Sequence, residues 1–130
     1  MPAYDSNQYD PPAPIALVTL RCADDAMVVT GVPMLLDTGA DVTLIPESFV
    51  QRLGAAIETD KAFELVGFDG TRSVVASAEL DLIFLSKAFR GRYLVTKESC
   101  GVLGRDVLNH LVLQFDGPKT EWTVIPSSAS

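Results

Sequence analysis

The most informative part of this chain is the segment Met34-Leu35-Leu36-Asp37-Thr38-Gly39-Ala40-Asp41-Val42-Thr43-Leu44-Ile45-Pro46. An apolar run leads directly into Asp-Thr-Gly-Ala, and a second run rich in β-branched residues leaves this loop. The pattern places the carboxylate of Asp37 on a tight loop at the end of a buried strand. The Thr38 hydroxyl is available to fix that loop, and Gly39 permits another backbone to approach closely.

Asp-Thr-Gly alone is a weak signal, because it also fits a β-turn in which Asp37 caps its own backbone and Gly39 supplies a positive φ. Two further features give it a context. One is Gly101-Val102-Leu103-Gly104-Arg105-Asp106-Val107-Leu108, in which two apolar residues precede Gly and Arg. The other is a predicted hairpin over 63–75, with the glycine-flanked tip Gly67-Phe68-Asp69-Gly70.

Together these features resemble the retropepsin family, the retroviral-type aspartic proteases. The string from Leu35 to Ile45 resembles the family's active-site signature, and 101–108 is similar to its second signature, which opens the C-terminal helix. The hairpin lies where the family has its flap. The resemblance spans roughly residues 15–116 and implies a mainly β fold. That fold is a retropepsin-like closed β-barrel, a single lobe with a flap hairpin and one or two short helices, active as a homodimer.

The chemistry of acid-type peptide hydrolysis supports the homodimer. Two carboxylates share one proton, so that one activates water while the other donates to the carbonyl oxygen. This chain holds one Asp-Thr-Gly and has no room for a second lobe. Asp41 is not the missing partner, because four residues farther along an extended turn it points elsewhere. The second carboxylate must therefore come from Asp37 of another copy across a two-fold axis.

The resemblance also implies roles for individual residues. Asp37, Thr38 and Gly39 form the catalytic loop, in which Thr38 hydrogen-bonds across the axis and Gly39 lies beside the substrate backbone. Ala40 and Asp41 contact substrate, and Arg105 pairs with Asp41 as structural support. The flap residues Gly67, Phe68, Asp69 and Gly70 close over the peptide and exclude water. A second set shapes either side-chain pockets or the core beneath them: Ala40, Val42, Ile45, Val102 and Leu103.

Hydrophobic periodicity predicts the remaining elements. In Val75–Phe84, alternation places Ala78 and every second residue after it on one face, and Ser77, Glu79 and Asp81 on the other, where Glu79 and Asp81 are expected to be solvated. Helices are predicted over Pro46–Leu53, with Pro46 at its first position and Gly54 just past its end, and over Arg105–Leu111. The other predicted strands are Ile15–Leu20, Met27–Leu36 (broken by Gly31 and Pro33), Phe63–Val66, Arg92–Val95, Leu111–Phe115 and Trp122–Ile125.

At 130 residues the chain has the length of one domain. We expect a flexible or extended Pro-rich arm without regular secondary structure at 1–14, the protease domain at 15–126 and a polar tail at 127–130. The arm and an extra hairpin around 116–119 depart from the viral pattern, so the dimer interface is expected to be built differently, mainly from C-terminal strands. The flap tip is also less glycine-rich than a typical viral one.

Composition argues against several kinds of partner. Acidic residues outnumber basic ones by 17 to 10, which disfavours nucleic acid and anionic membrane surfaces. The sequence contains neither a membrane-spanning run nor a secretory signal, so a cytoplasmic protein with free Cys22 and Cys100 is expected. His110, the only histidine, is poor material for a triad or, with two distant cysteines, for zinc. No metal or other cofactor is expected.

Two functions remain open at this point. The first is an aspartic endopeptidase that cleaves extended polypeptide segments. The alternative is a retropepsin-shaped module that binds peptides or proteins with little or no catalysis. The intact Asp-Thr-Gly-Ala motif favours the endopeptidase, because a pure binder has no evident need for a carboxylate pair.

Overall fold

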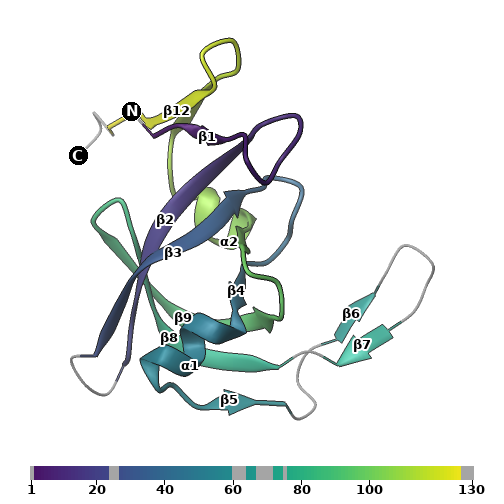
Figure 1. The fold of residues 1–130 in the computed structure, drawn as a ribbon. Coiled ribbons are helices and arrows are strands. Elements are labelled where there is room, and N and C mark those ends of the chain that lie inside the picture. Colours follow the sequence, from purple (N-terminus) through teal and green to yellow (C-terminus); the bar gives the residue numbers. More distant parts are fainter. Residues whose placement is uncertain (1, 24–26, 60–63, 67–71, 75, 127–130) are drawn as a thin grey trace.

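The computed structural model describes residues 2–23, 27–59, 64–66, 72–74 and 76–126 (Figure 1). The fold is mainly β, with two short helices. In chain order the elements are β1 (Tyr4–Asp5), β2 (Ala13–Arg21), β3 (Val28–Leu36), β4 (Leu44–Pro46), α1 (Glu47–Leu53), β5 (Ile57–Glu58), β6 (Glu64–Val66), β7 (Arg72–Val74), β8 (Ser77–Phe84), β9 (Lys87–Thr96), β10 (Gly101–Leu103), α2 (Arg105–Leu108), β11 (Leu113–Asp116) and β12 (Glu121–Val124).

Six strands close into a barrel in the order β2-β3-β10-β4-β9-β8, and β8 pairs back onto β2. The pairs β3–β10 and β4–β9 are parallel, and the other four pairs are antiparallel. β10 therefore lies between β3 and β4, although it comes from much later in the chain. Closure leaves no free edge within these six strands and confirms the predicted closed β-barrel.

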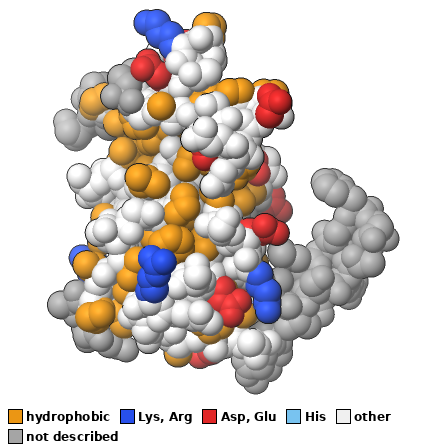
Figure 2. Space-filling view, viewed as in Figure 1, with side chains coloured by type: hydrophobic (Ala, Val, Ile, Leu, Met, Phe, Trp, Pro, Cys, Tyr) orange, Lys and Arg blue, Asp and Glu red, His pale blue; other side chains and the backbone are white. Residues whose placement is uncertain are grey.

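The barrel interior is filled by one face of each strand. The alternation predicted for β8 is confirmed, since Ala78, Leu80, Leu82 and Phe84 are all buried. Trp122 from β12 extends this core, with its ring 5.9 Å from that of Phe84 and its indole N–H donating to the Ile15 carbonyl. On the face seen in Figure 2, hydrophobic side chains also gather over β2 and β3. Leu17 on β2 and Val28 on β3 are among the exposed hydrophobic residues.

The predicted break in the second strand is wrong, because β3 runs continuously from Val28 to Leu36. The pairing with β2 shifts register between Val18 and Leu20, so that β3 carries one residue more than β2 there. Gly31 adopts a φ of 71°, which fits a bulge whose extra residue needs a left-handed conformation. The sheet absorbs the glycine as a bulge instead of ending at it.

Both helices are shorter than predicted. α1 begins at Glu47, so Pro46 is its N-cap in extended conformation and not its first residue, while Gly54 ends it as expected. α2 ends at Leu108 instead of Leu111, and its N-cap is Gly104. The expectation of two short helices is confirmed.

The N-terminal segment forms more structure than expected. Tyr4–Asp5 pairs with Ala13–Pro14, so the prediction that the arm lacks regular secondary structure is wrong for β1. The backbone N–H of Tyr4 also donates to Thr120, next to β12 (Figure 1). The C-terminal hairpin is confirmed as the antiparallel pair β11–β12. The tail at 127–130 lies outside the described residues, and the three-part division of the chain stays a prediction.

The predicted hairpin is confirmed by the antiparallel pair β6–β7, which projects from the barrel in Figure 1. Its tip, Gly67 to Gly70, lies outside the described residues. Among the helices that the structure describes, none is long and apolar enough to cross a membrane.

Asp81 corrects the prediction of a solvated face on β8. Its side chain is only 1% exposed, because Arg21 on β2 and Arg90 on β9 stand directly opposite it in the two neighbouring strands. Arg21 donates to Oδ2 from Nη2 at 2.9 Å, and Arg90 donates to Oδ1 from Nε at 2.8 Å. The hydrogen bonds from Arg90 lower the pKa of Asp81 to about 2, against the opposing effect of burial and with further lowering by Arg21.

Candidate active site

Asp37 follows directly after β3 and continues its pairing, since its backbone N–H donates to the Leu103 carbonyl at 3.1 Å. The carboxylate Oδ1 then accepts the Gly39 N–H at 2.9 Å, and the Asp37 carbonyl accepts the Ala40 N–H at 3.2 Å. Asp37 therefore both caps its own tight turn and keeps a half-exposed carboxylate at the end of a rigid strand. The β-turn that Asp37 caps and the candidate catalytic loop are therefore the same segment of chain.

Thr43 anchors the C-terminal end of this loop by hydrogen bonds. Its side chain is 1% exposed; Oγ1 donates to Asp106 Oδ1 at 2.6 Å and accepts the Gly104 N–H at 3.1 Å. The Thr43 N–H also donates to Asp106 Oδ2 at 3.1 Å. Sequence reasoning missed this anchor. The only signal for it was an acid in the first turn of the helix that follows the second motif.

Gly104 lets the two motifs touch backbone to backbone. A Cβ there would lie 2.6 Å from the carbonyl carbon and oxygen of Val42, too close for any side chain. The next residue, Arg105, donates its N–H to the Ala40 carbonyl at 2.9 Å. The glycine between the apolar pair and the arginine is thus required by the packing of the 37–43 loop on α2.

The Arg105 guanidinium closes the arrangement. It donates to the Thr38 carbonyl at 2.6 Å and forms an ion pair with Asp41. The pairing of Arg105 with Asp41 that the resemblance implied is therefore present within one chain. Thr38 and Asp41 are exposed at the surface, so neither residue is buried by the packing of the loop.

The structure thus gathers Asp37, Thr38, Gly39, Ala40, Asp41 and Arg105 into one cluster. The flap residues Gly67, Phe68, Asp69 and Gly70 lie outside the described residues, so their placement in the site stays a prediction. Chemically, the cluster presents the Asp37 carboxylate of one chain, which is held by the Gly39 N–H and is only partly buried.

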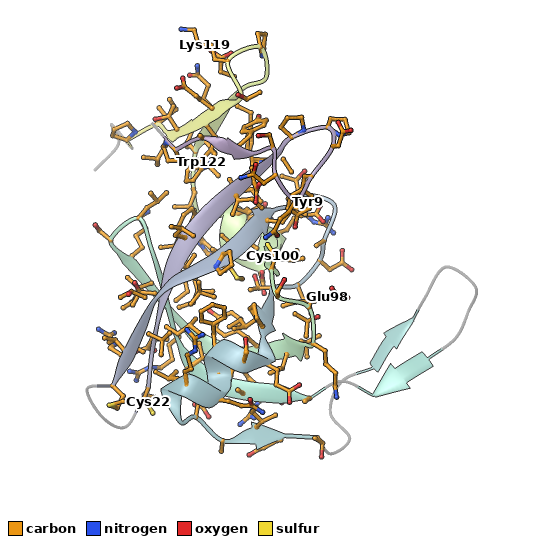
Figure 3. All side chains as sticks on the ribbon, viewed as in Figure 1. Tyr9, Cys22, Glu98, Cys100, Lys119 and Trp122 are labelled. Carbon is orange, nitrogen blue, oxygen red and sulfur yellow. The ribbon has the colours of Figure 1, made fainter. Side chains whose placement is uncertain are left out.

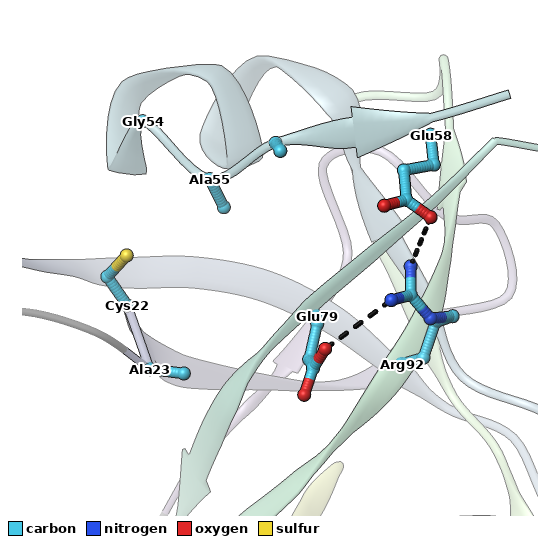
Figure 4. Close-up of a pocket in the computed structure, with 8 residues that line it drawn as sticks. Cys22, Ala23, Gly54, Ala55, Glu58, Glu79 and Arg92 are labelled. Atoms are coloured by element: carbon cyan, nitrogen blue, oxygen red, sulfur yellow. Dashed lines mark hydrogen bonds and ion pairs between the residues drawn. The ribbon is translucent and has the colours of Figure 1, made fainter.

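A separate pocket of about 430 Å³ shares no residue with this cluster. It lies between the end of β2, the segment after α1, and strands β8 and β9, with the Cys22 thiol on one wall (Figure 4). Arg92 bridges Glu58 at 3.0 Å and Glu79 at 3.4 Å across it. Cys22 and Cys100 are both free, as expected.

Within the described part of the chain, no three His, Cys, Asp or Glu side chains gather as a metal ion would need. His110 is exposed after α2, and its ring lies 5.8 Å from that of Phe89.

Comparison with known proteins places this geometry in a family. The family model described as retroviral aspartyl protease matches residues 15–116. Comparison with curated proteins found no match. Among solved structures, EIAV protease complexed with the inhibitor HBY-793 is similar over 75% of this chain and 86% of its own, with 23% identity and a TM-score of 0.59. A retropepsin-like aspartic protease from Rickettsia conorii is 13% identical over 80% of this chain and 87% of its own, with a TM-score of 0.47. The match to the family model covers most of the chain, motifs and barrel included, and the chain therefore belongs to the retroviral aspartyl protease family.

Proposed function

We propose that the chain is an aspartic endopeptidase that hydrolyses peptide bonds in extended polypeptide segments, using the Asp37 carboxylates of two copies. The observation that carries the proposal is the Asp37 loop itself. It presents a half-exposed carboxylate on a hydrogen-bonded turn at the end of a barrel strand, in a chain of this protease family. The motif alone has no such weight.

In the proposed homodimer the two carboxylates face each other across a two-fold axis with a water molecule between them. Two carboxyl groups this close do not both ionise, so one keeps a proton. The ionised carboxylate takes a proton from water as the water oxygen attacks the peptide carbonyl carbon, and the other carboxyl donates its proton to the carbonyl oxygen. The first carboxyl then gives the proton it took from water to the amide nitrogen, the second takes back the proton from the carbonyl oxygen, and the tetrahedral intermediate collapses with cleavage of the C–N bond and release of the amine.

The other residues are proposed to position rather than react. Gly39 holds the Asp37 carboxylate through its N–H, and the exposed Thr38 is free to hydrogen-bond to the partner loop. Ala40 and Asp41 lie beside the substrate, while Arg105 supports the loop from α2. The β6–β7 hairpin is proposed to close over the bound peptide through Gly67, Phe68, Asp69 and Gly70 and to exclude water.

The test compares wild type with Asp37→Asn on a peptide library between about pH 4 and 7, where shared-proton dyads operate. The asparagine amide oxygen still accepts the Gly39 N–H but cannot act as a base, so we expect cleavage to fall by at least about a thousandfold in a folded protein. The matched control is Asp116→Asn, whose carboxylate likewise accepts a turn N–H, from Lys119 at 3.1 Å.

Undiminished cleavage by Asp37→Asn would overturn the proposal. Peptide binding without any cleaved product from the wild type would favour the alternative, a peptide-binding module.

A further inference from the structure

A second pocket, of about 340 Å³, is lined by Leu35, two residues before Asp37 on β3. Its floor comes from β3 and β10, through Leu35 and Val102, and its rim from the segment before β10, through Glu98 and Cys100. One wall is Tyr9, which belongs to the N-terminal segment before β2. Figure 3 shows Tyr9, Cys100 and Glu98 near one another, at a distance from Cys22.

The floor of this pocket and the Asp37 carboxylate share one face of β3. Leu36 is 6% exposed and points into the core, so its neighbours Leu35 and Asp37 point to the opposite face. Because the Asp37 N–H bonds to Leu103, the strand geometry continues to Asp37. Val102 stands opposite Leu35 in the β3–β10 register. The pocket therefore begins about 7 Å along the strand from the carboxylate.

Contacts on both sides hold Tyr9 at this pocket. β1 pairs with the start of β2, and the Asp5 carboxylate accepts the N–H groups of Asn7 at 2.8 Å and Gln8 at 3.2 Å, which shapes the loop that leads to Tyr9. A hydrogen bond with Cys100, followed by burial and nearby negative charge, raises the pKa of the Tyr9 phenol to about 12. The Cys100 thiol itself donates to the Gly101 carbonyl at 3.5 Å.

We propose that Tyr9 is a specificity-determining residue: its ring closes one side of the pocket beside Asp37 and limits the substrate side chain that enters. This inference rests on the proposed function and gives the N-terminal segment a part in it. The floor of Leu35 and Val102 is apolar, while Glu98 places a negative charge at the rim. The pocket therefore takes apolar side chains such as leucine and methionine, disfavours tryptophan because its broad ring system would meet the Tyr9 ring, and rejects aspartate and glutamate for their charge.

The experiment measures kcat/KM for peptides that are identical except at the residue on one side of the cleaved bond, which is Leu, Trp or Glu. In Tyr9→Ala the pocket loses a wall, so the ratio of Trp to Leu cleavage should rise about tenfold. Tyr9→Phe keeps the ring and should stay within about twofold of wild type. Tyr4→Ala is the matched control, because Tyr4 lies in the same segment but packs against the core, and its ratio should not change.

A second readout does not need catalysis. Bound peptide should slow the alkylation of Cys100 by iodoacetamide but not that of Cys22, which lines the other pocket. In wild type the Leu peptide should protect Cys100 better than the Trp peptide, and Tyr9→Ala should remove this difference.

These readouts separate the two proposals. If the wild type cleaves but Tyr9→Ala has the wild-type ratio, the role of Tyr9 is wrong and the proposed function stands. A second outcome is that the wild type cleaves nothing while the Leu peptide still protects Cys100 better than the Trp peptide, and this difference is lost in Tyr9→Ala. In that case the proposed catalysis is wrong and the assignment of the pocket stands. Equal alkylation of Cys100 with and without saturating peptide overturns the assignment of the pocket.

Discussion

Two clusters of aspartate and arginine in this molecule have similar compositions and opposite surroundings. At the Asp37 loop, the Asp41 side chain is 81% exposed and Arg105 is 42% exposed. In the barrel wall, Asp81 is 1% exposed beneath Arg21 and Arg90. Solvent screens the first cluster strongly and the second weakly. The wall cluster therefore stabilises the barrel, while the loop cluster positions groups that stay accessible.

The largest expected effect comes from the backbone contact beneath the loop cluster. Gly104→Ala forces a Cβ against Val42, so we expect a loss of about 3 kcal/mol or more in the free energy of unfolding, measured with urea. Gly117→Ala is the control, since a Cβ there meets nothing within 4 Å. Equal stability of the two variants would contradict the close approach of loop and helix.

Asp81→Asn tests the wall cluster. The pKa of Asp81 is lower in the folded chain than its ordinary value of 3.8, so its stabilisation is present above about pH 4 and lost as the pH falls towards 2. We expect the variant to lose about 2 kcal/mol at pH 7, somewhat less than a fully buried pair gives, because both guanidinium groups are partly in solvent.

Urea unfolding at pH 7, 4 and 2.5 measures this difference. The gap between wild type and Asp81→Asn should shrink as the pH falls. A gap that stays constant with pH would show that the charge of Asp81 is not what stabilises the wall.

Arg105→Gln tests the loop cluster, where we expect a smaller effect on stability than at Asp81 and a larger effect on cleavage. It removes the contacts to Asp41 and the Thr38 carbonyl, but the pair is exposed, so the free energy of unfolding should fall by no more than about 1 kcal/mol. The fall in kcat/KM, converted to a free energy, should exceed this loss of stability, because the loop that carries Asp37 loses a support. A kcat/KM equal to wild type would show that Arg105 does not position the loop.

The smallest effect is expected at the separate pocket, where Arg92 bridges two exposed glutamates. Glu79→Gln removes one of its two ion pairs, the longer one at 3.4 Å. We expect a change below about 0.5 kcal/mol in the free energy of unfolding and no change in cleavage. A loss as large as that of Asp81→Asn would remove the contrast between exposed and buried clusters.

The closed barrel and the Arg105–Asp41 pair were predicted from the family resemblance, and local patterns were sufficient to predict a mainly β fold, the Asp37 loop and the alternation of β8. Local patterns gave wrong predictions where the burial of a side chain depends on which strands pair and in which register. Asp81 looked solvated because nothing local shows that Arg21 and Arg90 stand opposite it once β2 and β9 flank β8.

The prediction for the N-terminal segment was wrong for a related reason. Its prolines argue against a strand, yet Tyr4–Asp5 finds partners in β2 and next to β12 that only the closed fold supplies. The same long-range placement brings Tyr9 to the pocket beside Asp37. Contacts between distant segments, not local propensity, therefore account for both errors.

The claim of an acid pair completed by two chains is tested most directly by mixing. Wild type at constant concentration is refolded with increasing amounts of Asp37→Asn, and cleavage per wild-type chain is measured. Because mixed dimers hold one carboxylate instead of two, a ninefold excess of the variant should leave about one tenth of the activity. Activity per wild-type chain that stays unchanged at every ratio would show that one chain is sufficient and would contradict the account.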